Sequence, residues 1–226
     1  MTNPIFCAID RPDLDGAVRL GEQLRGAVGG LKLGLEFFTA QGPAGVRQVA
    51  AASGLPIFLD LKLHDIPNTV AGAVRSAASL GVAMLTVHAS GGQEMLRAAV
   101  EAAAAVPSPP RVLAITVLTS LDATDLHEIG VEAAPLDQAL RLAELAAGCG
   151  VGGLVCSPHE VAAIRERVGD DVELVVPGIR PAGSAAGDQK RTMTPAEAIA
   201  AGADRLVIDR PITAAPAPAA AARTIA

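Results

Sequence analysis

The segment FLDLKLHDIPNTV, residues 58–70, joins a strand-like apolar run to several charged residues. Asp60, Lys62 and Asp65 interrupt the run, and Thr69 follows closely. Burying a charge is costly unless the charge is paired or used. Because side chains alternate along a strand, we expect Asp60 and Lys62 to point to the same side. The segment therefore predicts a strand whose end carries a group of opposite charges.

The rest of the chain alternates between short aliphatic runs and Ala-rich amphipathic segments. The runs occupy residues 5–10, 31–38, 56–63, 83–90, 111–119, 153–158, 173–179 and 205–212. The amphipathic segments include residues 13–28, 42–53, 92–106, 135–150 and 194–203. Eight strands that alternate with helices are typical of an eight-stranded parallel α/β barrel, the (β/α)8 or TIM barrel. We expect one such barrel, forming a single domain over residues 1–226.

Two further segments bear on this architecture. The Ala/Pro-rich residues 214–224 could form a disordered tail or a final helix, and the barrel pattern favours a closing helix. Residues 180–195 are the longest irregular stretch, and loops of this length are commonly lids or binding loops. A doubly wound sheet is less well supported, because no G-x-G-x-x-G turn follows the first run.

Composition narrows the classes of function. The net charge of −6 argues against a general nucleic-acid-binding surface, but it leaves room for a small basic pocket that binds an anion. No run of about 18 apolar residues predicts a membrane span, and the N-terminus lacks the basic region of a signal peptide. The three cysteines and four histidines lack metal-ligand spacing. We expect a cytoplasmic protein with reduced thiols and no metal site.

Polar residues recur at the ends of the runs, and in such a barrel the active site lies at the C-terminal ends of the strands. They are Asp10, Lys32, Asp60 with Lys62, His88, Thr119, Ser157, Arg180 and Arg210. Lys32 fits less neatly because it stands near the start of its run, so that strand could be short, or LEFF (35–38) could be loop. For a single Asp–Lys pair, a structural salt bridge would be the better interpretation. Because charges recur at several strand ends, we favour a functional site.

The two segments after the last two runs suggest an anion site. PGIR (177–180) and DRPIT (209–213) each contain an arginine. The loops after the seventh and eighth strands form the usual phosphate site of these barrels. Backbone N–H groups and an arginine fork suit phosphate oxygens. We therefore expect a phosphorylated small molecule as ligand.

Taken together, these motifs resemble orotidine 5′-phosphate decarboxylases along nearly the whole chain. The strongest element is DLKLHDIPNT (60–69), which is similar to the family's Asp-x-Lys-x-x-Asp signature and the residues after it. Shorter matches support it: LKLGLEFF, TVHASGG, VLTS, VVPGIRP, DQKR and RPIT. The resemblance implies conversion of orotidine 5′-monophosphate to uridine 5′-monophosphate and CO2, the last step of de novo pyrimidine nucleotide synthesis. It also implies that no metal or cofactor takes part.

The resemblance further implies a catalytic set. Lys32, Asp60, Lys62 and Asp65 resemble the family's charged tetrad, with Lys62 as the proton donor and Asp60 beside the substrate carboxylate. Lys32 and Asp65 would hold the array and contact the ribose. Asp65 and Thr69 resemble residues that this family donates across the interface of a homodimer, so each dimer would hold two shared sites.

Further positions resemble the family's substrate ligands. Asp10 resembles a ligand of the ribose hydroxyl groups, and Thr119 resembles a ligand in the pyrimidine pocket. Arg180, Gln189 and Arg210 resemble the phosphate grip, with Gln189 on a mobile loop.

Asp209 departs from the family, which usually has glycine before the arginine that corresponds to Arg210. Either its carboxylate repels the phosphate, or its side chain turns away and only its backbone N–H binds. Two rival functions remain open from the sequence. One is a Mg²⁺-assisted enzyme of the wider sugar-phosphate superfamily, against which HDIPNT and the pair Lys32 and Lys62 speak. The other is an inactive barrel that only binds nucleotides, for which Asp209 is the one support.

Overall fold

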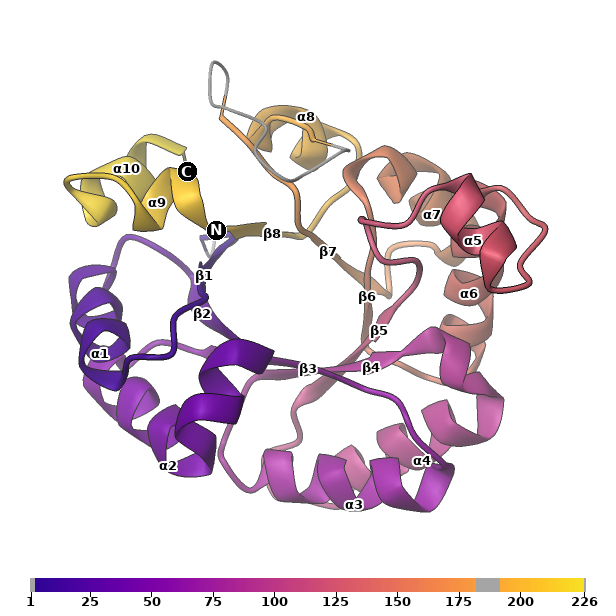
Figure 1. Ribbon diagram of the computed structural model, residues 1–226, viewed down its shortest axis with the longest axis horizontal. Helices are drawn as coiled ribbons and strands as arrows, with labels where there is room; N and C mark the ends of the chain where they lie inside the picture. The colour runs from indigo at the N-terminus through magenta and orange to yellow at the C-terminus, as the bar shows by residue number, and fades with distance from the viewer. Residues whose placement is uncertain (1–2, 182–191, 226) are drawn as a thin grey trace.

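The computed structural model describes residues 3–181 and 192–225. Its strands are β1 (Ile5–Ile9), β2 (Gly30–Gly34), β3 (Ile57–Leu63), β4 (Met84–His88), β5 (Arg111–Ile115), β6 (Gly153–Val155), β7 (Glu173–Val176) and β8 (Arg205–Ile208). They form a closed parallel barrel in chain order, in which β1 pairs with both β2 and β8 (Figure 1). The predicted (β/α)8 barrel is therefore confirmed, and each predicted run overlaps one strand.

Helices surround the barrel on its outer side (Figure 1). They are α1 (Leu14–Gln23), α2 (Leu35–Ser53), α3 (Pro67–Ala78), α4 (Gly92–Ala104), α5 (Ala123–Glu128), α6 (Pro135–Gly148), α7 (Val161–Val168), α8 (Pro195–Ala200), α9 (Arg210–Thr213) and α10 (Pro218–Ile225), with 3-10 turns η1 (Ala89–Gly91) and η2 (Pro158–Glu160). The predicted closing helix is confirmed as α10, which contacts α1. Within the described ranges, no helix combines the length and the apolar character needed to cross a bilayer.

Strand β2 is shorter than its predicted run. It ends at Gly34, and α2 begins at Leu35, so LEFF forms the first turn of a helix rather than strand or loop. Phe37 in this turn is fully buried, which explains why the apolar pattern continues past the strand. The early end of β2 places Lys32 close to the mouth of the barrel and accounts for its poor fit to the longer strand.

Apolar side chains fill the barrel below its mouth. The interior cluster consists of Phe6, Ala8, Phe58, Met84, Leu113, Val175 and Val207. The rings of Phe6 and Phe58 meet edge to face, with centroids 6.2 Å apart. A larger apolar layer lies between the strands and the surrounding helices. The barrel interior is thus a packed core, and the charged side chains at its mouth lie above an apolar floor.

Gly30 in β2 offers a test of this packing. A Cβ atom at Gly30 would lie 2.2 Å from the nearest atom of the Phe6 ring. Phe6 is only 3% exposed, so its ring has little room to move. We predict that Gly30→Ala lowers the free energy of unfolding by about 1–3 kcal/mol, the usual cost of overpacking a core. Urea denaturation followed by circular dichroism measures this change.

Gly148 at the end of α6 provides the matched control. A Cβ atom there would meet no atom within 4 Å. Alanine is favoured over glycine in a helix by roughly 0.5–1 kcal/mol, so Gly148→Ala is expected to leave stability unchanged or to raise it slightly. Equal urea midpoints for Gly30→Ala and the wild-type protein would contradict the tight packing around Phe6.

Candidate active site

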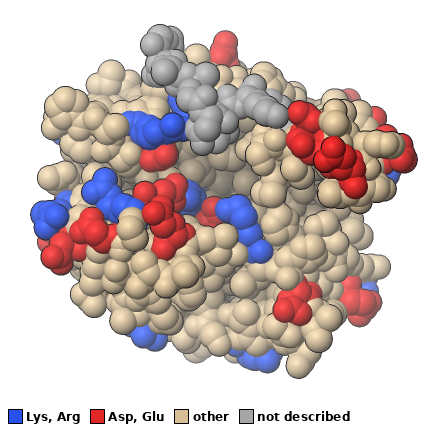
Figure 2. Space-filling model, in the orientation of Figure 1, with Lys and Arg blue, Asp and Glu red and all other residues tan. Residues whose placement is uncertain are grey.

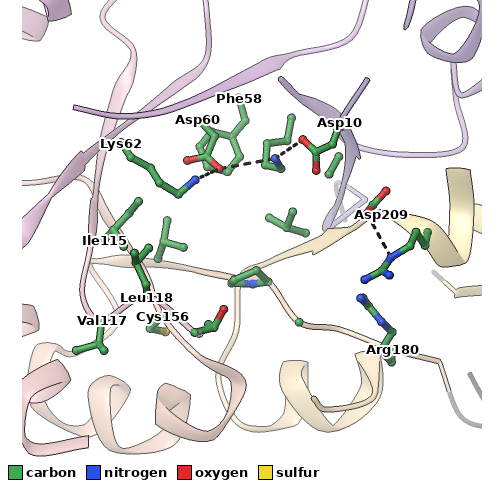
Figure 3. A pocket seen from close by; sticks show the side chains of 18 residues that line it. Asp10, Phe58, Asp60, Lys62, Ile115, Val117, Leu118, Cys156, Arg180 and Asp209 are labelled. Atoms are coloured by element: carbon green, nitrogen blue, oxygen red, sulfur yellow. Dashed lines mark hydrogen bonds and ion pairs between the residues drawn. The ribbon is translucent and has the colours of Figure 1, made fainter. Parts of the chain in front are cut away.

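A cavity of about 260 Å³ opens at the C-terminal ends of the strands (Figure 3). Its wall has a charged part from β2, β3 and the residue after β1, and an apolar part from β5, β6 and the residues after them. The segments after β7 and β8 add a third part that contains two arginines. In space-filling view, charged side chains of both signs lie side by side near the hollow at the barrel mouth (Figure 2).

The charged part is a chain of alternating ammonium and carboxylate groups. Lys32 Nζ lies 3.0 Å from Asp10 Oδ1 and 3.7 Å from Asp60 Oδ2. Lys62 Nζ donates a 2.6 Å hydrogen bond to the same Asp60 oxygen (Figure 3). The expectation that Asp60 and Lys62 point to the same side is confirmed. Both ammonium groups therefore share one carboxylate.

The barrel strands bring these groups together and bury the central ones. Pairing of β2 with β3 sets Gly34 opposite Asp60. A Cβ atom at Gly34 would lie 3.0 Å from Asp10 Oδ1 and 3.2 Å from Lys32 Nζ, so glycine leaves room for that ion pair. Lys32 and Asp60 are 9% and 8% exposed. Charges this deep are stable only because each has an opposite partner.

Asp60 is held as a carboxylate. Burial by itself raises the pKa of Asp60, but the charges of Lys32 and Lys62 and hydrogen bonds from Lys62 and Thr86 lower it, and the net pKa is below the usual range. Opposite charges and donated hydrogen bonds both favour the ionised form. The site therefore keeps a fixed negative charge between two positive ones at neutral pH.

A bulge in β3 orients Lys62. Leu59 pairs with Leu85 and Leu63 pairs with Val87, so four steps along β3 correspond to two along β4. Lys62 lies in this bulge with a φ of 52°, in the left-handed region, and no other non-glycine residue among those described has a positive φ. Thr86 of β4, which the sequence reasoning did not select, faces the bulge and contacts both Lys62 and Asp60. Threonine is common in strands, so nothing in the pattern distinguished it.

The apolar part of the wall suits a flat ring. Ile115, Val117, Leu118 and Val155 line it, and Thr119 adds a polar residue to the wall. Cys156 also lines the wall, and burial raises the pKa of its thiol, so this cysteine acts as an apolar wall group rather than a nucleophile. The cysteines at 7, 149 and 156 are all unpaired and buried.

Arg180, labelled in Figure 3, and Arg210 bring two guanidinium groups to the third part of the wall. Arg180 is 8% exposed, and one of its guanidinium N–H groups donates to the Ile179 carbonyl at 2.9 Å. Burial lowers the pKa of Arg180, and the charge of Arg210 lowers it further, whereas Asp209 raises it. An anion bound between the two arginines would offset the repulsion between their positive charges and favour the charged form of Arg180.

The Asp209 carboxylate lies in the same wall. Its Oδ1 accepts a 3.0 Å hydrogen bond from the Thr213 hydroxyl, and its Oδ2 lies 3.7 Å from Arg210 Nε. The side chain is one-third exposed, at 33%. The carboxylate is therefore held towards α9 while still lining the cavity. Repulsion of a phosphate by this group stays a prediction.

Asp65 and Thr69 are not among the residues that line the cavity. Both side chains are exposed. Asp65 Oδ1 accepts a 2.6 Å hydrogen bond from the N–H of Ile66, the residue before α3. Within one chain, the structure thus brings together Lys32, Asp60 and Lys62 but leaves Asp65 outside this group.

The remaining sequence candidates contribute less to the cavity. Gln189 lies outside the described residues, as does most of the expected lid. His88 does not line the cavity, and its ring lies against that of His64, with centroids 5.4 Å apart. Burial lowers the pKa of His88. Within residues 3–181 and 192–225, no group of three His, Cys, Asp or Glu side chains could hold a metal ion.

Comparison of the sequence with known families gives one match that spans nearly the whole chain. Residues 3–225 match the family described as Orotidine 5′-phosphate decarboxylase / HUMPS family. The orotidine 5′-phosphate decarboxylase of Paramagnetospirillum magneticum is 57% identical over 230 residues, covering 100% of this chain and 97% of that protein. The enzyme of the same name from Anaeromyxobacter sp. is 58% identical over 222 residues, covering 98% of this chain and 96% of that protein.

Solved structures agree with this match. The crystal structure of orotidine 5′-phosphate decarboxylase from Lactobacillus acidophilus has a TM-score of 0.87 at 35% identity, covering 99% of this chain and 97% of that one. The structure of the protein of the same name from Pyrococcus horikoshii has a TM-score of 0.80 at 24% identity, covering 98% and 96% of the two chains. At that identity the second likeness concerns the fold alone.

Proposed function

The chain belongs to the orotidine 5′-phosphate decarboxylase / HUMPS family and is a decarboxylase, a carbon–carbon lyase of pyrimidine biosynthesis, and on this premise we propose how its own residues act. The substrate is orotidine 5′-monophosphate and the products are uridine 5′-monophosphate and CO2. The observation that carries the mechanism is the buried Asp60 carboxylate shared by Lys32 and Lys62.

The three parts of the cavity wall suit three parts of the substrate. The 5′-phosphate would bind to Arg180 and Arg210, with Gln189 as a further ligand. The pyrimidine would lie against the apolar wall, with Thr119 at its edge. The ribose would contact the Asp10 end of the charged part. Phosphate binding far from the reacting carbon would contribute orientation rather than chemistry.

Asp60 and Lys62 would carry out the chemical step. The bond between the ring carbon and the carboxyl carbon breaks, CO2 leaves, and the electron pair stays on the ring carbon. The Lys62 ammonium stabilises this negative charge and then donates a proton from Nζ to form the C–H bond. Lys62 regains a proton from solvent. The Asp60 carboxylate, beside the substrate carboxylate, disfavours the bound substrate relative to the transition state.

The bonds, electrons and proton of this reaction balance without an electron acceptor or a Lewis acid. We therefore propose a reaction without metal or cofactor. The positive charge that a metal would offer is supplied by Lys32 and Lys62, which lie 3.7 and 2.6 Å from Asp60 Oδ2. Preorganised charges in a site shielded from water act more strongly than in bulk solvent.

The chain would act as a homodimer in the cytoplasm, each chain forming one catalytic barrel domain over residues 1–226. Asp65 and Thr69 are exposed and lie outside their own cavity wall, which leaves them available to a second copy. Leu35 and Ile66, which follow neighbouring strands at the barrel mouth, are 51% and 66% exposed. Exposed apolar side chains of this size suit a protein interface. We propose that Asp65 and Thr69 enter the partner's site and that no nucleic acid or membrane is bound.

Replacement of the proton donor tests the mechanism. We predict that Lys62→Ala abolishes measurable turnover of orotidine 5′-monophosphate, because it removes both the charge at the reacting carbon and the proton. Wild-type turnover is expected to be unchanged by EDTA. Ultraviolet absorbance follows the conversion to uridine 5′-monophosphate. Arg141→Ala, which removes one positive charge on α6 outside the cavity wall, is the matched control and should retain full activity. EDTA-sensitive wild-type turnover, or substantial activity in folded Lys62→Ala, would refute the proposal.

Complementation tests the shared site. Homodimers of Lys62→Ala and of Asp65→Ala are each expected to be inactive. In a heterodimer of the two, one site receives both lesions and the other receives none, so we predict about half of the wild-type turnover per heterodimer. Differently tagged chains, purified as the mixed dimer, provide the sample. Inactivity of the mixed dimer would show that Asp65 serves its own chain.

Asp209 is expected to weaken phosphate binding. Two unit charges about 4 Å apart interact by about 4 kcal/mol at an effective dielectric constant of about 20, and partial exposure reduces that repulsion. We predict that Asp209→Gly lowers KM for orotidine 5′-monophosphate roughly tenfold, equivalent to about 1.4 kcal/mol, with little change in kcat. Steady-state kinetics measure both constants.

Two variants separate charge from other effects. Asp209→Asn keeps the size of the side chain and should give most of the same decrease in KM. Asp170→Gly removes a carboxylate that is 98% exposed and lies outside the cavity wall, and it should leave KM unchanged. If KM is the same in Asp209→Gly and the wild-type enzyme, the carboxylate does not oppose the phosphate.

A further inference from the structure

We infer that Thr86 is a positioning residue of this active site, whose hydroxyl group fixes the Asp60 carboxylate and the Lys62 backbone relative to each other. Thr86 does not line the cavity and would not touch substrate. The inference deepens the proposed function and rests on it, because it assigns Thr86 an effect through Asp60 and Lys62.

The first observation is the place of Thr86 in the sheet. It lies in β4 between Leu85 and Val87, the two residues that pair with β3 on either side of the bulge. Opposite this one residue, β3 contains Asp60, Leu61 and Lys62. The regular ladder between the two strands is interrupted there, so the backbone groups of the bulge need other partners.

The second observation is that one hydroxyl group makes two different hydrogen bonds at this point. Thr86 Oγ1 accepts from the backbone N–H of Lys62 at 2.9 Å and donates to Asp60 Oδ1 at 2.9 Å. A hydroxyl has one proton to donate and lone pairs to accept, so both roles are filled at once. Thr86 is fully buried, at 0% exposure. Water is therefore not available to replace these bonds without rearrangement.

The geometry links these bonds to the catalytic groups. The backbone N–H that donates to Thr86 Oγ1 belongs to Lys62. Lys62 has the left-handed backbone conformation that non-glycine residues rarely adopt. Binding of Asp60 Oδ1 by Thr86 directs Oδ2 to the two ammonium groups, with Lys62 Nζ at 2.6 Å and Lys32 Nζ at 3.7 Å. Loss of the hydroxyl would therefore free the Lys62 backbone to change conformation and the Asp60 carboxylate to rotate.

Thr86→Val tests the inference because it removes the hydroxyl and nearly keeps the shape. We expect kcat for orotidine 5′-monophosphate to fall roughly 10-fold to 100-fold, the size of effect that misplacement by about 1 Å produces. KM should change less than about threefold, because the phosphate grip is at the other side of the cavity. Thr86→Ser keeps the hydroxyl and should retain kcat within about threefold.

Thr116 provides the matched control. It is a buried threonine, 3% exposed, that follows β5, and its hydroxyl donates to the Val155 carbonyl at 3.2 Å without contact to Asp60 or Lys62. Thr116→Val also removes one buried hydrogen bond and should change kcat less than about threefold. Equal losses in Thr86→Val and Thr116→Val, wild-type kcat in Thr86→Val, or a loss in Thr86→Ser as large as in Thr86→Val would each overturn the inference. If Thr86→Val does not fold, Thr86→Ala takes its place with the same expected results.

Titration of Asp60 gives a second measurement that does not depend on turnover. Lys32 from β2, Lys62 from β3 and His88 from β4 are the charged or titratable groups that act on Asp60. A hydrogen bond donated to a carboxylate favours its ionised form, so loss of the Thr86 hydroxyl should raise the pKa of Asp60. As the pH falls, activity should then be lost at a higher pH in Thr86→Val than in the wild-type enzyme.

Carbon-13 NMR of the labelled Asp60 carboxyl group measures this shift directly. An unchanged Asp60 titration in Thr86→Val would contradict the positioning role. If the wild-type chain itself failed to convert orotidine 5′-monophosphate, the proposed function would be wrong, and the Asp60 titration would still decide whether Thr86 controls the carboxylate.

Discussion

Two ammonium groups share one buried carboxylate at the mouth of this barrel, and the site is built around that interaction. Asp60 stays ionised although it is buried, because Lys32 and Lys62 lie beside it. The two buried groups, Lys32 and Asp60, would each be destabilised here without an opposite charge. The strands that carry them are neighbours in a closed sheet, so the array depends on the whole barrel rather than on one loop.

The same closed sheet places chemically different groups at different positions around the cavity. Charged groups come from β2, β3 and the residue after β1, apolar groups come from β5, β6 and the residues after them, and arginines follow β7 and β8. A phosphorylated pyrimidine nucleotide has an anion, a sugar and a flat ring in that spatial relation. In the proposed mechanism, the order of the strands around the barrel would set specificity for such a molecule, and the chemistry would be confined to one side of the mouth.

Much of this organisation could be predicted from the sequence, because it depends on local patterns. Alternation of aliphatic runs and amphipathic segments predicted the barrel, and the two-residue spacing of Asp60 and Lys62 predicted their common side. The alternative of a short second strand is confirmed, but LEFF was not predicted as helix because a buried helical turn after a strand looks like more strand. The place of Lys32 could not be judged until β2 was known to end at Gly34. Thr86 was missed since its partners lie 24 and 26 positions away in sequence, and only the bulge brings them together.

The bulge between Leu59 and Leu63 also constrains how such an enzyme can evolve. Side-chain direction in a strand reverses with each residue, so the excess of residues in β3 determines which groups reach the cavity. A substitution in this stretch alters one side chain, and its effect on the site can be small or large. An insertion or deletion of one residue would turn every later side chain of the strand to the opposite face and carry Lys62 out of the site. The length of this short segment therefore matters more to the site than the identity of most residues within it.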